Sequence, residues 1–425
     1  MLMFHKLYTR PLDMMLGHFE GLKAQKMNQR VRRNISAMNK LAFFRNALFV
    51  IAVIMPFVHY KAGITAGQLI VAEAIFALSL VLFEVPSGWI ADIWTRKSAM
   101  IAGIALELLG FALMGIMDSY AMLVISQIVV AAGLSLISGT ISAMLYDTLL
   151  EARLTRLYRK LEGFRHGLAL YAVGASGVMS GVLFAIHPDL VIIASLITVG
   201  ISFVYALFLY EPKRVKEAIH KNPIHDILVT IDLGVRKDPY IGRLVLFTAC
   251  LFGVTNAAFW MQQPYYIALD ISIVWFGIFG ATGHLIGGLC AHFSHLLSKR
   301  LTTHMLLLLA MLWLIGIYVF SALVPGFIGI ALLMSGAALY GVTFPVIQDE
   351  VNKRVSSARR ATLLSCVSLC ARLMFAIIAF SISGLIDQAQ GVYSALLILA
   401  LLLVLTALPT WVLFYRARPV AKYAK

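Results

Sequence analysis

Long apolar segments, separated by short polar ones, follow one another along most of the chain. Each is about twenty residues or longer, the length that an α-helix needs to cross a hydrocarbon layer of roughly 30 Å. The segments are continuous in Leu, Ile, Ala and Gly and do not alternate in polarity, as strands of a membrane β-barrel would. The pattern predicts an all-α membrane protein with twelve spanning helices. They are expected at residues 41–60, 68–91, 97–117, 120–148, 164–186, 190–210, 241–267, 272–297, 303–323, 325–348, 361–386 and 391–414.

The composition and the distribution of charge agree with this prediction. Hydrophobic residues make up 61% of the 425 residues and charged residues only 13%, which is too apolar for a soluble chain. All but three of the 35 Lys and Arg fall on the side where the positive-inside rule places the cytoplasm. The exceptions are Lys61, outside, and Arg45 and Arg372, inside helices. Both termini are therefore expected in the cytoplasm, and the net charge of +15 reflects membrane orientation rather than a nucleic-acid partner.

A polar segment at residues 211–240 divides the chain into two sets of six helices. The expected domains are a basic N-terminal segment at 1–40, bundles at 41–210 and 241–416, and a tail at 417–425. The N-terminal segment is interpreted either as an amphipathic helix on the inner leaflet or as a solvated tail. Glycine and aspartate recur eight residues apart at equivalent places in both halves, which suggests a duplication with parallel orientation. The pairs are Gly139 with Asp147 and Gly341 with Asp349.

A charged motif follows the second predicted helix. It reads Gly88-Trp-Ile-Ala-Asp92-Ile93-Trp94-Thr95-Arg96-Lys97. This loop resembles the signature loop of the major facilitator superfamily of membrane transporters, and the likeness extends over residues 41–416. Ile93 stands where the family has a base and Thr95 where it has a glycine, so we expect a less tight turn. The resemblance, to bacterial-type members, implies two six-helix bundles related by a parallel repeat.

The resemblance also implies a cytoplasmic gate. In the family, the motif carboxylate lies near the N-terminus of helix 11 and pairs with the motif arginine and with an acid on helix 4. Asp92, Arg96 and Asp147 match those positions, with Gly88 and Lys97 completing the motif. An anion at a helix N-terminus is stabilised by roughly 0.3–1 kcal/mol. Such a contact would hold the cytoplasmic side shut; the alternative is a solvated turn.

Ionisable residues inside the predicted helices are further candidates, because charge within a membrane is costly to retain. Glu84 and Glu107 are expected at similar depths, roughly 12 and 15 Å into the membrane. Either could carry a proton, or form a structural ion pair with Arg45. Arg372 could bind an anionic group of a substrate or pair with a buried acid. His284 could titrate during transport or donate a hydrogen bond to a neighbouring helix.

A third group of residues could line a substrate cavity. Asn256, Trp260 and Gln263 are spaced to share one face of the seventh predicted helix. Tyr171 and Tyr340 could add to that surface. The alternative is an aromatic belt at the membrane interface, which is common at the ends of spanning helices.

These features favour a secondary transporter of a bacterial inner membrane that works by alternating access. Proton-coupled efflux of a small organic compound, such as a metabolite or a siderophore-like or drug-like molecule, is the expected activity. The alternatives are an importer, a lipid flippase, or a membrane sensor or scaffold without turnover. Lipids, protons and a small-molecule substrate are the expected partners of a monomer.

Enzymatic activity is not expected, because the sequence contains no Walker loop, catalytic triad or metal-ligand cluster. Neither a cofactor nor a metal ion is therefore predicted. The cysteines at positions 250, 290, 366 and 370 all fall within predicted helices and are interpreted as small apolar residues.

Overall fold

The computed structural model describes residues 28–212, 238–354 and 357–417. These residues form helices and connecting turns, and no strand occurs among them. Twelve helical segments in the described ranges are long and apolar enough to cross a membrane. The predicted all-α architecture and number of spanning segments are therefore confirmed.

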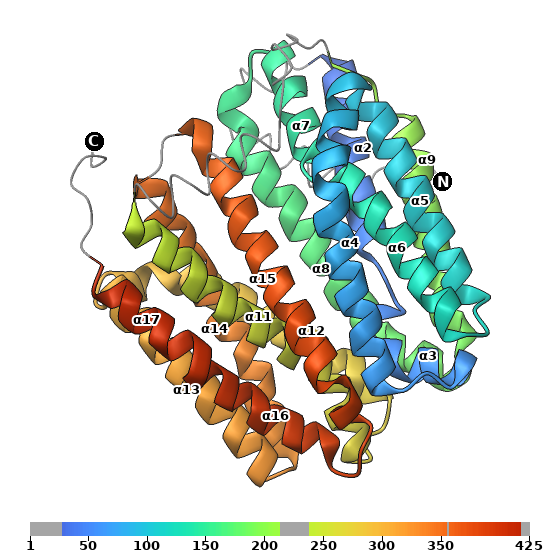
Figure 1. The fold of residues 1–425 in the computed structure, drawn as a ribbon. Coiled ribbons are helices and arrows are strands. Elements are labelled where there is room, and N and C mark those ends of the chain that lie inside the picture. The colour runs from blue at the N-terminus through green and yellow to red at the C-terminus, as the bar shows by residue number, and fades with distance from the viewer. Residues whose placement is uncertain (1–27, 213–237, 355–356, 418–425) are drawn as a thin grey trace.

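The N-terminal half forms one bundle, drawn from blue to green in Figure 1. Its first spanning segment is broken by a short 3-10 turn, and its fourth is broken at Gly139, which adopts a left-handed φ of 75°. Its elements are α2 (Gln29–Asn46), η2 (Ile51–Val53), α3 (Ile54–Ala62), α4 (Ala66–Ile93), α5 (Arg96–Gly115), α6 (Tyr120–Ile137), α7 (Thr140–Glu151), η3 (Thr155–Leu157), α8 (Tyr158–Ile186) and α9 (Asp189–Leu207).

The C-terminal half forms the second bundle, drawn from yellow-green to red in Figure 1. Asp238 accepts a hydrogen bond from Tyr240 N at the start of its first helix, where Pro239 needs no donor. Its last spanning segment contains a π-helical turn, η5. Its elements are α11 (Pro239–Ala268), α12 (Val274–Ser298), α13 (Thr303–Leu323), α14 (Phe327–Arg354), α15 (Ser357–Ile386), α16 (Gly391–Leu402), η5 (Leu403–Ala407) and α17 (Leu408–Tyr415).

The first helix begins earlier than predicted. Val31, Ile35 and Met38 are buried along one face of α2, and Asn34 donates a hydrogen bond to Thr148 of α7 at 2.9 Å. The expected boundary after residue 40 is therefore wrong, because residues 29–40 belong to the first helix of the bundle. The arginines between these apolar positions concealed the buried face in the sequence. Residues 1–27 lie outside the described part.

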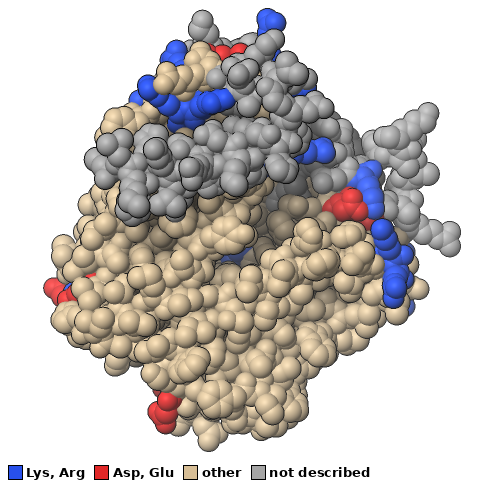
Figure 2. Space-filling model, turned by 180° about the vertical axis from the view of Figure 1, so that it is seen from behind, with Lys and Arg blue, Asp and Glu red and all other residues tan. Residues whose placement is uncertain are grey.

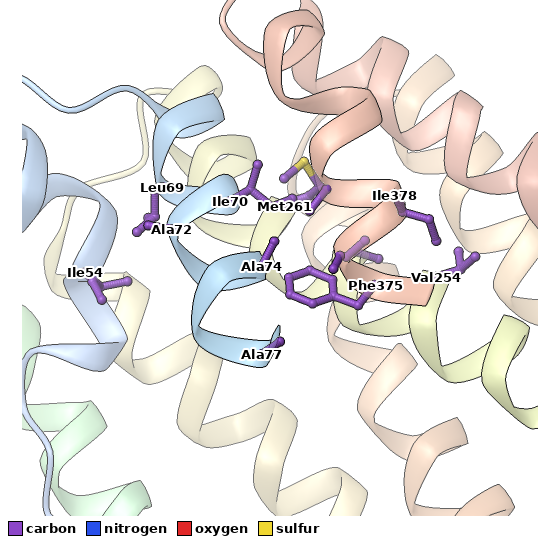
Figure 3. Close-up of a cluster of buried hydrophobic side chains, with 14 of the residues drawn as sticks. Ile54, Leu69, Ile70, Ala72, Ala74, Ala77, Val254, Met261, Phe375 and Ile378 are labelled. Carbon is purple, nitrogen blue, oxygen red and sulfur yellow. The ribbon is translucent and has the colours of Figure 1, made fainter. Parts of the chain in front are cut away.

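The two halves touch at one end of the molecule and separate at the other (Figure 1). We call the end where α9 stops and α11 starts the linker end, and the opposite end, where α3 meets α4, the hairpin end. Across the halves, α4 packs against α15, α8 against α12, and α11 against α4 and, through Gln263, η2. Near the hairpin end this interface contains small residues, which let the helices approach closely. Ala74 and Ala77 of α4 face Phe375 of α15 in Figure 3.

Candidate functional site

The space between the bundles is bounded by helix faces that touch one another nearer the hairpin end. Figure 2 shows a hollow below the linker end, with basic atoms visible inside it. On each of these helices, the face that packs against the opposite half near the hairpin end extends toward the linker end, where it lines the gap. Residues seven or eleven positions along a helix share a face, because 3.6 residues make one turn. This spacing identifies the residues that line the gap.

On α11, Gln263 marks the face that meets the N-terminal half. Its Oε1 accepts a hydrogen bond from Met55 N at 3.0 Å, and its Nε2 donates to the Ile51 carbonyl at 3.0 Å. Gln263 thus joins the halves in this conformation, and its expected place in a substrate cavity stays a prediction. Its helical neighbour Trp260 is partly buried, and Asn256, seven residues from Gln263, is exposed. Asn256 therefore lies on the face that lines the gap.

On α12, His284 lines the gap in the same way. It lies seven residues from Gly277, whose backbone packs so closely on α8 that a Cβ atom there would approach the Gly177 carbonyl oxygen. His284 is exposed, and its ring centroid is 6.4 Å from that of Phe259. The imidazole therefore lies beside an aromatic ring of α11.

Aromatic side chains of α11 and α14 form a cluster. The Tyr340 ring lies 5.0 Å from Phe252 and 5.5 Å from Phe344, between centroids. Phe252 lies eleven residues before Gln263, on the face of α11 that lines the gap, and Tyr340, which is 46% exposed, packs against it. Tyr171 of α8 is 73% exposed and makes no hydrogen bond or ring contact within the described residues. The expected place of Tyr171 in a substrate cavity therefore stays a prediction.

Arg372 lies on α15, eleven residues before Ser383, whose carbonyl packs against Gly67 of α4. It is therefore on the face that contacts α4 near the hairpin end and lines the gap further along. Its side chain is partly buried and makes no ion pair or hydrogen bond with any described residue. Glu84 of α4 lies within electrostatic reach of Cys366 of α15. It too has no ion pair in the described part of the chain.

Arg45 and Glu107 form a buried ion pair between α2 and α5. Arg45 Nε donates to Glu107 Oε2 at 2.7 Å and Nη2 donates to Oε1 at 2.5 Å. Their side chains are 16% and 7% exposed. Of the two interpretations of Glu107 from the sequence, this geometry is that of the structural pair.

The motif residues are described in part. Arg96 Nη2 lies 3.1 Å from Asp147 Oδ2, so the structure brings together this expected pair. Gly88 and Asp92 fall within α4, but their surroundings, and the side chains at the start of α15, lie outside what the structure describes. The expected contact of Asp92 with helix 11 therefore stays a prediction. Lys97 is half-buried at the start of α5.

Three carboxylates that the sequence analysis did not single out have specific partners. Glu211 accepts hydrogen bonds from the backbone N–H groups of Arg96 and Lys97, at 3.0 and 2.8 Å, and so caps α5. Glu73 of α4 accepts a hydrogen bond from Gln127 of α6 at 2.5 Å. Asp387, after α15, contacts the start of α4, as detailed below. Glu211 and Asp387 lie in loops next to helix ends, where capping acids are common. Glu73 could have been found in the sequence as an acid within an apolar run.

No group of His, Cys, Asp and Glu suited to a metal ion occurs among the described residues. The four cysteines are free thiols, and Cys250 and Cys366 are buried. The geometry therefore defines a membrane protein with a central gap, lined by aromatic side chains, a histidine and an arginine, between two helical bundles.

The chain belongs to the Major Facilitator Superfamily, whose family model matches residues 41–379. It is therefore a membrane transporter by family and fold. A search of the curated proteins found no match.

Solved structures of transporters share the fold. The nucleoside transporter NupG has a TM-score of 0.73 at 14% identity, over 89% of this chain and 98% of that chain. A bacterial homolog of the human lysosomal transporter Spinster, described as inward-facing and unoccupied, has a TM-score of 0.72 at 14% identity, over 92% and 98%. A POT family transporter in complex with 5-aminolevulinic acid has a TM-score of 0.70 at 13% identity, over 92% and 98%. At these identities the likeness concerns the fold alone.

Proposed function

We propose that this protein is a proton-coupled secondary transporter of a small amphipathic organic compound with an anionic group. The observation that carries the proposal is Arg372, a partly buried cation on the face of α15 that lines the gap, with no ionic partner among the described residues. A permanent cation within a membrane protein is expensive to retain and usually faces a partner or a water-filled path. An anionic substrate group would supply that partner.

An apolar, aromatic surface is provided by α11 and α14. Phe252, Tyr340 and Phe344 present an aromatic surface, and Phe259 is 41% exposed beside His284. Rings of this kind bind apolar and aromatic parts of a ligand with little loss of side-chain entropy. A compound with an organic body and one negative charge would satisfy both surfaces.

Alternating access is supported by the conformation, which is closed at the hairpin end and open at the linker end (Figure 1). Under the positive-inside rule the linker end is cytoplasmic, so the conformation is inward-open. We propose a bacterial inner-membrane location with this orientation. Export in exchange for protons is the direction that we expect, and the sign of proton movement tests it.

The test uses purified protein in proteoliposomes that enclose a pH-sensitive dye. Pools of small organic carboxylates and phosphates are added beside neutral analogues of each. We expect protein-dependent proton movement with anionic compounds, and export predicts that it runs opposite to the substrate. Silence across all pools, with protein shown to be folded and inserted, would overturn the proposal.

Substitution of Arg372 then tests its role. A hydrogen bond to a charged group contributes about 1.5–3 kcal/mol, so Arg372→Gln should raise the substrate KM by about 10- to 100-fold. Arg372→Lys should retain part of the affinity, because the charge remains but the planar donor set is lost. Arg416→Gln is the matched control, since Arg416 is an exposed cation at the linker end. Equal KM values in Arg372→Gln and the control would refute substrate binding by Arg372.

A further inference from the structure

Glu73 is a buried acid in the interior of the N-terminal bundle. It lies on α4 and is 5% exposed, as is its partner Gln127 on α6. Gln127 Nε2 donates a hydrogen bond to Glu73 Oε1 at 2.5 Å, which links the two helices. The neutral amide is the sole hydrogen-bonding or ionic partner of this carboxyl group in the described part of the chain.

The other buried acids among the described residues, Glu107, Glu350 and Asp238, each have a counter-charge or two hydrogen-bond donors, whereas Glu73 has a single donor. Glu107 has the guanidinium of Arg45 as counter-charge, and Asp147 has that of Arg96. A buried carboxylate without a cation carries a large desolvation cost, whereas a protonated carboxyl is uncharged. A protonated carboxyl and a side-chain amide can also exchange two hydrogen bonds. The surroundings of Glu73 in this conformation therefore suit the protonated group.

The elements packed against α4 are α3, α5, α6, α11 and α15. None of their ionisable side chains that the structure describes forms a hydrogen bond or ion pair with Glu73. Those side chains are His59, Tyr60 and Lys61 on α3; Arg96, Lys97 and Glu107 on α5; Tyr120 on α6; Tyr240, Arg243, Cys250, Tyr265 and Tyr266 on α11; and Cys366, Cys370 and Arg372 on α15.

The position of Glu73 ties its burial to the conformation of the transporter. It follows Ala72 and precedes Ala74, both fully buried, and Ala74 faces Phe375 of the other half in Figure 3. Glu73 also lies seven residues from the first residue of α4, so it is roughly 10 Å from the hairpin end. When the hairpin end opens, α4 must separate from α15. Water then reaches the flank of α4 beside Glu73.

We propose that Glu73, hydrogen-bonded to Gln127, is the proton-binding site that couples the transport cycle to the proton gradient. The inference rests on the proposed function, because a coupling site requires proton-coupled transport. With the hairpin end open, the hydrated carboxylate takes one proton from water on that side and becomes a neutral carboxyl group. The neutral group favours closure of the hairpin end. It gives the same proton to water on the linker side before the next opening, so that one proton crosses in each cycle.

The main test compares two transport modes of Glu73→Gln in proteoliposomes. Glutamine is uncharged, retains a similar shape and hydrogen-bonding capacity, and imitates the protonated acid. We expect a loss of at least tenfold in substrate-dependent proton movement and in uphill transport driven by a pH gradient. Exchange of labelled for unlabelled substrate at equal pH should persist within about twofold, because it needs no net proton transfer.

Controls distinguish this inference from the proposed function. Asp118→Asn removes an exposed acid at the hairpin side and should leave both modes unchanged. If the native protein shows no proton-linked transport, the proposed function fails. If it does and Glu73→Gln retains coupling, or Glu84→Gln alone abolishes it, the assignment to Glu73 fails while the function stands.

A spectroscopic measurement covers the case in which Glu73→Gln does not fold. Infrared difference spectra of the native protein between acidic and alkaline buffers should contain the C=O stretch of a protonated carboxyl group in a dry site. Glu73→Asp should shift the frequency of that band, and Asp118→Asn should not. Absence of the band, or an unshifted band in Glu73→Asp, would overturn the proposal.

Discussion

Removal of the Asp387 carboxylate should weaken closure of the hairpin end. Asp387 Oδ2 accepts a hydrogen bond from Thr65 Oγ1 at 2.7 Å, and Oδ1 accepts one from Gly67 N at 2.8 Å. These contacts, which we call the Asp387 latch, join the segment after α15 to the first turn of α4. Gly67 permits the approach, because a Cβ atom there would collide with the Ser383 carbonyl oxygen.

The size of the effect follows from the two contacts. A hydrogen bond to a charged group contributes about 1.5–3 kcal/mol, and an anion in the first turn of a helix adds about 0.3–1 kcal/mol. Asp387 is exposed, so solvent screening reduces the total well below the sum of these terms, to about 1–2 kcal/mol. Asp387→Asn loses the charge but retains an acceptor, and should reduce the preference for the closed hairpin end by about fivefold. Asp387→Ala loses both and should reduce it by about 10- to 30-fold.

Distances between spin labels on the two halves measure this equilibrium. Cysteines introduced at Ser119 and Ser272 would place one label on each half at the hairpin end, in a background without the four native cysteines. The long-distance population should grow in the order native, Asp387→Asn, Asp387→Ala. Asp189→Asn is the matched control, because Asp189 pairs with Lys61 within one half, at 2.8 Å.

An unchanged distance distribution in Asp387→Ala would refute the reasoning, provided that the control and the variant are equally folded. A change in Asp189→Asn of the same size would also contradict it. Both variants would then act through surface charge rather than through a contact between the halves.

Two further predictions concern stability and closure. Glu107→Gln should lower the free energy of unfolding by about 3–5 kcal/mol, because it leaves the buried Arg45 charge uncompensated. A fall in thermal-unfolding temperature in detergent measures this, and Arg45→Met combined with Glu107→Leu should be less destabilised than Glu107→Gln. Gly277→Ala should disfavour the closed hairpin end, because its Cβ would collide with the Gly177 carbonyl oxygen. The rate at which cysteines introduced at the hairpin end react with a membrane-impermeant maleimide should then rise several-fold. Gly280→Ala should leave this rate unchanged, because a Cβ atom at position 280 would meet open space.

The helices were predictable because the bilayer requires every spanning segment to satisfy its own backbone hydrogen bonds over a fixed length. Residue depth also followed from the sequence, since each helical residue rises about 1.5 Å. The direction of a side chain around its helix did not. Spacing placed Glu107 at a depth where Arg45 could reach it, but only the packing of α2 on α5 brings the pair together. Gln263 likewise depends on the break in the first spanning helix at η2, which the apolar run concealed.

The proposed sites together set the balance between the two conformations of the transporter. A shift from 1:99 to 99:1 requires about 5.5 kcal/mol, which exceeds the 1–2 kcal/mol expected of the Asp387 latch. The latch, the Gln263 contacts with η2 and the close packing of α8 on α12 therefore act together in closing the hairpin end. One pH unit supplies about 1.4 kcal/mol for each proton bound in only one conformation. Under the proposed function, the free energy that one pH unit supplies through protonation of Glu73 is of the same order as that of the Asp387 latch, so a moderate pH gradient would bias the equilibrium without trapping it. Under the same proposal, a substrate that neutralises Arg372 would contribute the remaining differential binding energy, since a ligand with equal affinity for both conformations would shift nothing.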